Sequence, residues 1–301
     1  DDVSTVTVAL LAVDTELTRE RRLKAGRTLF EYGALFSYRW QRADVPADYL
    51  PTAAPVPIDP GQVVMRGFTA SAVDAYIKVS HPWFRLGLEA AVLNATIEQP
   101  SLVPGAGYRT SLESLQIGAA LELEIGPWDG PVVGGLDAGF ASGDPSPGFG
   151  AFVGTADPAP VAGDLEGPQA SLPHDNRVDN FRFHSDYRVD RILFREILGT
   201  VTDAVYIRPH VKWNITEIGP GILTLSLAAV ASFAVEANST PGGERPLGIE
   251  LDPSISYHSK DGLGLALDYA VLFPLSGFRN ATLGRDPSPA QLGRLSIIYG
   301  F

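Results

Sequence analysis

The sequence contains no cysteine and no long apolar run, and each absence removes a class of protein. Without cysteine the chain has no disulfide framework, no thiolate metal site and no thiol nucleophile. A membrane-spanning helix needs roughly 20 consecutive apolar residues. No stretch of the 301 residues approaches that length, although 45% of them are hydrophobic. The sequence therefore excludes a helical membrane protein.

Charge, and positive charge above all, is also scarce. Charged residues make up 19% of the chain, against about 25% in ordinary soluble domains. The net charge is −12 and the 23 Lys and Arg residues are dispersed, whereas nucleic-acid binding requires a basic patch. We therefore expect no nucleic-acid partner, and the composition does not favour a typical cytosolic enzyme.

What the sequence does contain is repeated alternation of apolar and polar residues. Successive side chains of a strand point to opposite faces, so alternation indicates a strand with one apolar face and one polar face. In the segment 263–273, for example, Leu265 and Leu267 share one face while Ala266 and Asp268 share the other. Glycine and proline gather between such segments, as turns require. Comparable segments occur at 3–14, 31–41, 71–80, 84–96, 112–125, 131–142, 205–215, 222–236, 249–258 and 293–301.

Several of these segments are as long as the roughly 9 to 11 residues that a tilted strand needs to cross a bilayer. We therefore predict an all-β protein, a transmembrane antiparallel β-barrel of about 11–12 visible strands formed by a single domain over residues 1–301. The alternative is a soluble jelly roll or sandwich, in which the apolar faces of two sheets would pack together.

The last segment adds a more specific signal. Leu295, Ile297, Tyr299 and Phe301 share one face, and the chain ends on the aromatic residue. This ending resembles that of outer-membrane barrels, in which the barrel-assembly machinery reads the final strand. The resemblance implies the outer membrane of a Gram-negative bacterium, with the lipid bilayer and lipopolysaccharide as surroundings. A homo-oligomer or a complex with other outer-membrane proteins is compatible with it.

The connections alternate between short and long along the whole chain. Barrels have short periplasmic turns and longer outer loops, and this rule places the start of the first strand outside. A complete barrel with an even number of strands would start in the periplasm, so we expect further upstream sequence and a larger barrel. No secretion signal heads the sequence. We therefore expect that a signal has been cleaved or that the sequence begins inside a longer precursor. The long connections are 43–69, 97–111, 143–201, 237–246 and 274–290.

The connection 143–201 contains a segment of different character. Val189, Ile192, Leu193 and Ile197 recur at helical spacing, and the pattern ends at Gly199. We predict a short amphipathic helix that folds inward as a constriction or lies over the mouth. A capped surface helix and a further strand are the alternatives. Its basic residues are Arg188, Arg191 and Arg195.

The run 181–209, with the stretch 139–144 upstream of it, resembles an uncharacterised family of Gram-negative outer-membrane β-barrels. It is more weakly similar to alginate-export-type porins, whose charged lumen passes an anionic polysaccharide. The resemblance covers most of the chain and implies a barrel fold. Because the family has no established substrate, it implies no catalytic residue.

The alternation places charges of both signs on the inner face, where charged rings can select permeating ions. The basic ladder on segment 205–215, close to the basic helix, is the best candidate for contact with an anionic solute. Internal salt bridges that close a filled barrel are the alternative. The predicted pore-lining and solute-binding residues are Arg39, Lys78, Arg85, Glu122, Arg188, Arg191, Arg195, Arg208, His210, Lys212, Glu250, Asp252 and Arg294.

Catalysis has little support in the sequence. The five histidines stand far apart, and neither a zinc-binding nor a nucleophile motif is present. Asp144, Asp164 and Glu166 do not have the spacing of a calcium loop, so we interpret them as solvated turn residues. We therefore predict no catalytic residue, no metal site and no cofactor. The expected function is a channel for small polar or anionic solutes, and the alternative is a structural or assembly barrel whose plugged lumen anchors partner proteins.

Overall fold

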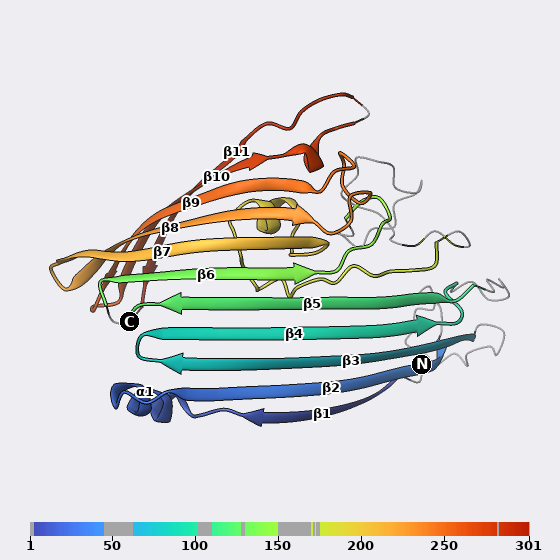
Figure 1. Ribbon diagram of the computed structural model, residues 1–301, viewed down its shortest axis with the longest axis horizontal. Coiled ribbons are helices and arrows are strands. Elements are labelled where there is room, and N and C mark those ends of the chain that lie inside the picture. Colours follow the sequence, from blue (N-terminus) through green and yellow to red (C-terminus); the bar gives the residue numbers. More distant parts are fainter. Residues whose placement is uncertain are drawn as a thin grey trace, which may run out of the picture.

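A computed structural model describes residues 3–44, 63–101, 110–127, 130–149, 170, 172, 175–281 and 283–300. These residues form one sheet of eleven antiparallel strands, each paired with its neighbours in sequence (Figure 1). The all-β class and the antiparallel order predicted from the alternation are confirmed. The strands are β1 (Ser4–Ala12), β2 (Leu29–Asp44), β3 (Val64–His81), β4 (Phe84–Ile97), β5 (Leu112–Ile125), β6 (Val132–Ala141), β7 (Ala204–Ile218), β8 (Gly221–Ala234), β9 (Pro246–Ser259), β10 (Leu263–Pro274) and β11 (Ala290–Tyr299).

Most strand ends fall close to the predicted positions, and β3 is the main exception. It begins at Val64, so the proline-rich connection predicted over 43–69 is shorter than expected. The register between β2 and β3 shifts between Gln41 and Ala43. On β3, Gly67 adopts a left-handed φ of 55°. Such irregularities shift the inward and outward positions, so the alternation did not reveal this part of the strand.

A helix, α1 (Glu16–Lys24), connects β1 to β2 and was not predicted. It begins at Thr15, whose side chain accepts the N–H of Thr18. Arg19 holds it against the sheet through an ion pair with Glu31 at 2.8 Å. None of its residues is buried, so it has no apolar stripe to reveal it. Among the described residues, no helix has both the length and the apolar character needed to cross a membrane.

The short turns and the long connections lie at opposite ends of the sheet. Figure 1 shows α1 and the turns β3–β4, β7–β8 and β9–β10 at one end, and the long connections at the other. The chain begins at the end of the long connections and finishes at the end of the short turns. The predicted alternation of connection lengths is therefore confirmed.

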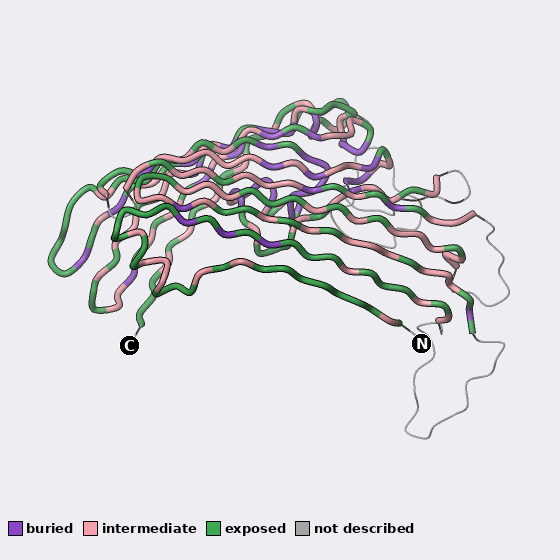
Figure 2. The backbone as a smooth tube through the Cα atoms, turned by 60° about the horizontal axis from the view of Figure 1, so that its bottom comes forward, coloured by how far each residue is buried: buried purple, intermediate pink, exposed green. Residues whose placement is uncertain are grey.

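The sheet bends into a trough, with β1 along one free edge (Figure 2). Within the described residues β1 pairs only with β2, and β11 pairs only with β10. A closed ring of eleven strands, one form of the predicted barrel, is therefore not formed by these residues alone.

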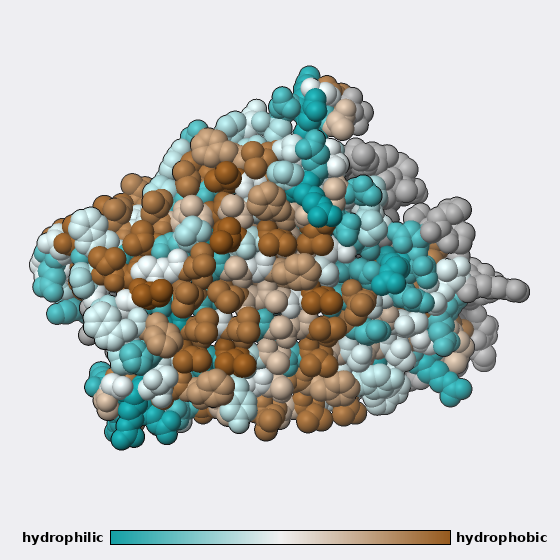
Figure 3. Space-filling model, in the orientation of Figure 1, coloured by the Kyte–Doolittle hydropathy of each residue, from teal (hydrophilic) through white to brown (hydrophobic). Residues whose placement is uncertain are grey.

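The convex face of the sheet is apolar and uncovered. Leu265 is 37% exposed, Leu267 is 55% exposed and Ile297 is 68% exposed. Apolar side chains form a broad band across the middle of this face, and hydrophilic ones gather toward its ends (Figure 3). Since the described residues form only one sheet, no second sheet packs against these side chains. The sandwich alternative is excluded for the described part of the chain.

Candidate functional site

Residues 175–203, called here the inner segment, join the sheet along an unpaired part of β5. Strand β6 pairs with β5 only from Gly118 to Ile125, which leaves the first half of β5 without a partner on that side. There the N–H of Glu113 donates to the carbonyl of Asn176 at 2.8 Å, and the N–H of Val178 donates back to Glu113 at 2.9 Å. The inner segment thus starts with an isolated parallel bridge between Arg177 and Glu113 of β5.

Aromatic side chains then guide the inner segment across the concave face. Phe181 lies against Gly118, where a Cβ atom would come within 2.2 Å of the ring. Phe183 packs against Phe181 and Tyr187, with ring centroids 5.7 and 5.2 Å apart. The hydroxyl of Tyr187 is hydrogen-bonded to that of Tyr206 on β7 at 2.9 Å. Glycine is required at residue 118 because any larger residue would displace the first ring.

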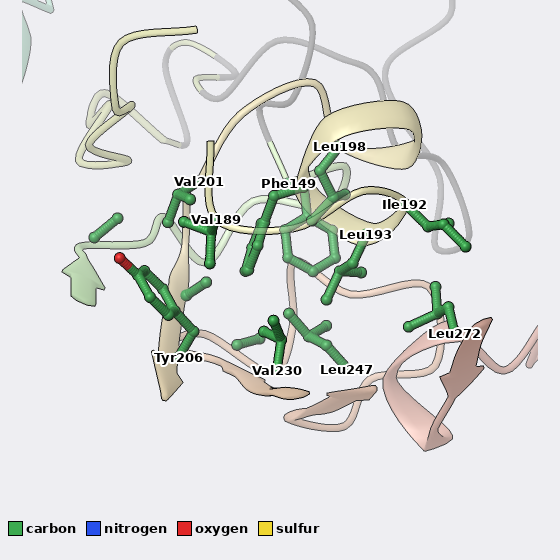
Figure 4. Close-up of a cluster of buried hydrophobic side chains, with 14 of the residues drawn as sticks. Phe149, Val189, Ile192, Leu193, Leu198, Val201, Tyr206, Val230, Leu247 and Leu272 are labelled. Atoms are coloured by element: carbon green, nitrogen blue, oxygen red, sulfur yellow. The ribbon is translucent and has the colours of Figure 1, made fainter. Parts of the chain in front are cut away.

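The middle of the inner segment packs into a hydrophobic core against the concave face (Figure 4). Burying one such aliphatic side chain contributes about 1.5–3 kcal/mol, so the contact holds the inner segment firmly inside the trough. Of the two placements expected for this segment, inward folding and lying over the mouth, the structure shows inward folding. The buried residues include Phe149, then Val189, Ile192, Leu193, Phe194, Leu198 and Val201 of the inner segment, and Tyr206, Val230, Leu247 and Leu272 of the strands.

Only η2 (Leu193–Ile197), one turn of π-helix, forms where a longer helix was predicted. The backbone N–H groups of Arg191, Ile192 and Leu193 instead donate to the carboxylate of Glu250 on β9, at 2.9, 2.8 and 2.9 Å. A helix leaves its first N–H groups without partners inside the helix, and Glu250 satisfies three such groups. Because these groups bind a side chain, the turn starts later than the apolar spacing suggests.

The prediction that Glu250 lines the pore is therefore wrong. Its side chain is fully buried and serves as an anchor for the inner segment. Asp190, which the sequence analysis missed, has a related role, since its carboxylate accepts the N–H of Phe194 at 2.9 Å. Burial, and then the nearby charge of Glu250, raise the pKa of Asp190. The N-cap of η2 is Ile192, which makes no side-chain cap hydrogen bond, so Asp190 does not occupy the position where a capping signal would have identified it.

Several cavities lie beside the inner segment, and two of them bring together most of the predicted site residues. The larger has a volume of about 510 Å³ and carries charges of both signs. Arg85 pairs with Glu124 at 2.7 Å, and Arg208 pairs with Asp137. His210 lies 3.4 Å from the same Asp137 carboxylate. This cavity brings together the predicted residues Lys78, Arg85, Glu122, Arg188, Arg208 and His210.

The second cavity, called here the basic cavity, has a volume of about 260 Å³. It lies between the inner segment and strands β7, β8 and β9. Its wall brings the basic ladder of β7 next to the basic residues around η2, as predicted. The predicted residues on its wall are Arg188, Arg191, Arg195, Arg208, His210, Lys212 and Asp252.

Besides Glu250, two predicted site residues line neither cavity. Arg39 is exposed on β2 and lines neither cavity. Arg294 on β11 approaches Glu196 of the inner segment at 3.5 Å and also lies outside both cavity walls. The alternation placed both residues on the inner face of the sheet. It does not show how far apart two residues on that face lie, so it could not predict which of them share a cavity.

A second anchor lies where the inner segment meets β7 and was also missed. Asp203 is fully buried, and its carboxylate accepts the N–H of Glu236 at 2.8 Å and the hydroxyl of Ser239. Burial raises the pKa of Asp203 to about 7. The partners belong to the connection between β8 and β9, so no local sequence signal identifies this contact.

The remaining calcium and metal candidates do not form a site in the described residues. Asp144 is buried, and its carboxylate accepts the N–H groups of Ser146 and Asp179, both at 2.9 Å. It is therefore not the solvated turn residue that was predicted. Asp164, Glu166 and Phe301 lie outside the described residues. In the described part of the chain, no three His, Asp or Glu side chains group as metal ligands.

No protein-family model matches the chain, and no curated protein matches it significantly. Among solved structures, the chain is similar to the β domain of the Bordetella autotransporter BrkA. The TM-score is 0.28 and the sequence identity 12%, with 99% of this chain and 91% of that chain covered. A TM-score this low adds no argument to the one from strand pairing. The fold established by the strand pairing is therefore an antiparallel sheet of eleven strands with a short helix.

Proposed function

We propose that the chain is part of an outer-membrane β-barrel that passes small polar or anionic solutes through a charged interior. The apolar band of the convex face is the observation that supports the membrane location. Monomeric soluble proteins rarely expose contiguous apolar patches larger than a few hundred Å², and here the band spans the sheet (Figure 3). The concave face, in contrast, carries charged side chains around the two cavities beside the inner segment, and this difference between the faces is the pattern expected of strands between lipid and lumen.

The solute class follows from the charges of the basic cavity. Its wall carries five cationic side chains and two carboxylates. Positively charged rings favour the passage of anions. Since Arg188 and Arg208 also border the large cavity, the two cavities adjoin and offer a solute one charged route beside the inner segment.

Ion selectivity in planar bilayers tests this proposal. Arg188 and Lys212 have no carboxylate within ion-pair distance among the described residues, so reversing their charges breaks no ion pair. We expect the unsubstituted protein to conduct with a preference for anions, and R188E/K212E to conduct with a preference for cations. Lys260→Glu, at the exposed β9–β10 turn, is the control and should leave the preference unchanged. A bilayer that stays sealed would refute the channel.

A second candidate is supported by the inner segment itself. Its hydrophobic core against β7, β8, β9 and β10 is the arrangement that a plugged barrel would have. In that case the protein would anchor partner proteins at the outer membrane through its long connections. Absence of conductance, together with reproducible co-purification of one partner from outer membranes, would favour this function over the channel.

A further inference from the structure

The basic cavity carries more positive charge than its surroundings neutralise. Arg191 is paired with Asp268 at 2.7 Å, and Arg208 is paired with Asp137. Arg188 and Lys212, in contrast, have no carboxylate within ion-pair distance among the described residues, and both are exposed to the cavity. Two of the five cations on this wall are therefore available to a solute.

A third cation is only weakly neutralised. Arg195 has Glu196 at 3.9 Å, and Glu196 is shared with Arg294 at 3.5 Å. Burial lowers the pKa of Arg195, and the charges of Arg294 and Arg188 lower it further. Like charges held this close repel one another, so an anion placed between them would relieve the repulsion.

The two acids on the wall oppose an anion less than their number suggests. Asp190 is buried, and its carboxylate accepts the backbone N–H of Phe194. Asp252 lines the wall as well but is buried, so it offers a solute little exposed surface. Arg188 and Lys212 are the exposed charges, and they determine what a solute meets.

Size and donor geometry then define the ligand. A volume of about 260 Å³ corresponds to roughly eight or nine water molecules, which is too small for an extended chain of sugars. Guanidinium groups bind carboxylate and phosphate oxygens in a fork of two hydrogen bonds. Several such groups around a small space favour an anion with more than one charge.

We propose that the basic cavity is a binding site for a compact multivalent oxyanion, a solute with two or three carboxylate or phosphate groups. The inference rests on the proposed function, because it makes this cavity the point at which a permeating solute pauses. The inner segment supplies Arg188, Arg191 and Arg195, and β7 supplies Arg208 and Lys212. An intact inner segment is therefore required for binding.

Calorimetric titration of the purified full chain in detergent tests the site without any bilayer. Citrate is the probe, and its neutral trimethyl ester is the matched control ligand. We expect citrate to bind and the ester not to bind. R188Q/K212Q should bind citrate roughly tenfold more weakly, a loss of about 1.4 kcal/mol, while K260Q should bind as the unsubstituted protein does.

The outcomes separate the site from the channel. If citrate binds but the protein does not conduct, the binding site is supported and the channel is refuted. If the protein conducts but citrate does not bind, the channel is supported and the binding site is refuted. Equal affinity of R188Q/K212Q and K260Q would overturn the proposal. If R188Q/K212Q loses its strand signal in circular dichroism, the unsubstituted protein alone tests the site. Binding of citrate without binding of the ester would then support the proposal, and equal binding of the two would overturn it.

Discussion

At the scale of single residues, the inner segment depends on buried carboxylates that meet backbone groups. Asp203 is one of only two non-glycine residues with a positive φ in the described part of the chain, at 46°. Asp tolerates this left-handed conformation better than most residues. Its position lets the carboxylate reach the N–H of Glu236 and the hydroxyl of Ser239. One side chain thereby links the end of the inner segment to the β8–β9 connection.

This link should depend on pH. Burial raises the pKa of Asp203 from 3.8 to about 7, so the folded state holds the proton more tightly than the unfolded chain does. The stability contributed by the protonated carboxyl is complete below about pH 4 and is lost as the pH rises toward 7. Between pH 4 and pH 8, the unsubstituted protein should therefore lose unfolding free energy relative to D203N, by on the order of a few kcal/mol.

Denaturant unfolding at a series of pH values measures this difference. Glu236 is the neighbouring acid whose charge also acts on Asp203, and it is present in both proteins, so the comparison isolates residue 203. D261N, at the exposed β9–β10 turn, is the control and should follow the unsubstituted protein. The interpretation fails if D203N shows the same dependence on pH as the unsubstituted protein.

At the scale of elements, the inner segment is held at four places: the edge of β5, the hydrophobic core, Asp203 and Glu250. The last of these is the most sensitive to substitution, because it satisfies three buried N–H groups at once. Hydrogen bonds to a charged group contribute about 1.5–3 kcal/mol each. Glu250 thus connects β9 to the inner segment more strongly than any single apolar contact.

We expect Glu250→Ala to release the turn around η2. The substitution leaves three N–H groups without an acceptor, at a cost of about 1–3 kcal/mol for each group that stays buried, although it also removes the charge that repels Asp190. Glu250→Gln retains one acceptor oxygen and should lose less. Faster trypsin cleavage after Arg191 and Arg195 measures the release. The control Glu217→Ala changes an exposed acid on β7, and trypsin should cleave this variant as fast as the unsubstituted protein. Equal cleavage rates for all variants would contradict the role of Glu250.

The elements differ in how far the sequence could predict them. A strand between two different environments shows its period of two directly, so all eleven strands were found from positions such as Leu265 and Asp268. Helix α1 was missed because none of its nine residues is buried. The pairing of 176–178 with β5 was missed because its partners are more than 60 residues apart in sequence. The alternation of a strand can be read from neighbouring residues, whereas the path of a long connection depends on residues that are far apart in sequence.

The site shows the same division. Arg208, His210 and Lys212 alternate along one strand, so their common face could be predicted, and so could their closeness to the next basic segment. Glu250 alternates with apolar neighbours along β9 just as a cavity-lining acid would, so the sequence predicted that role for it. Its actual partner is the backbone of residues 191–193, and no side-chain pattern records a backbone partner. Alternation therefore identifies the face of a residue and leaves its contacts undetermined.

At the scale of the whole molecule, the two faces of one sheet differ in the surroundings they require. Leu267 lies near the middle of β10 on the convex face and is 55% exposed. Ala266, the preceding residue, lies at the same depth and points to the concave face. If the convex face contacts hydrocarbon, an arginine at residue 267 must be desolvated there, whereas one at residue 266 stays in a polar interior.

We therefore expect Leu267→Arg to destabilise the protein in lipid vesicles by about 2–4 kcal/mol, the cost of arginine near a bilayer midplane. Ala266→Arg should cost clearly less, because residue 266 pairs with Ser256 and Ser296 on the polar face of the sheet. Unfolding free energies from denaturant titration in vesicles measure both values. If the convex face instead meets water, arginine at residue 267 would be the better tolerated of the two, since it would replace an exposed leucine. The sign of the difference between these neighbouring residues thus identifies the face that lies in lipid.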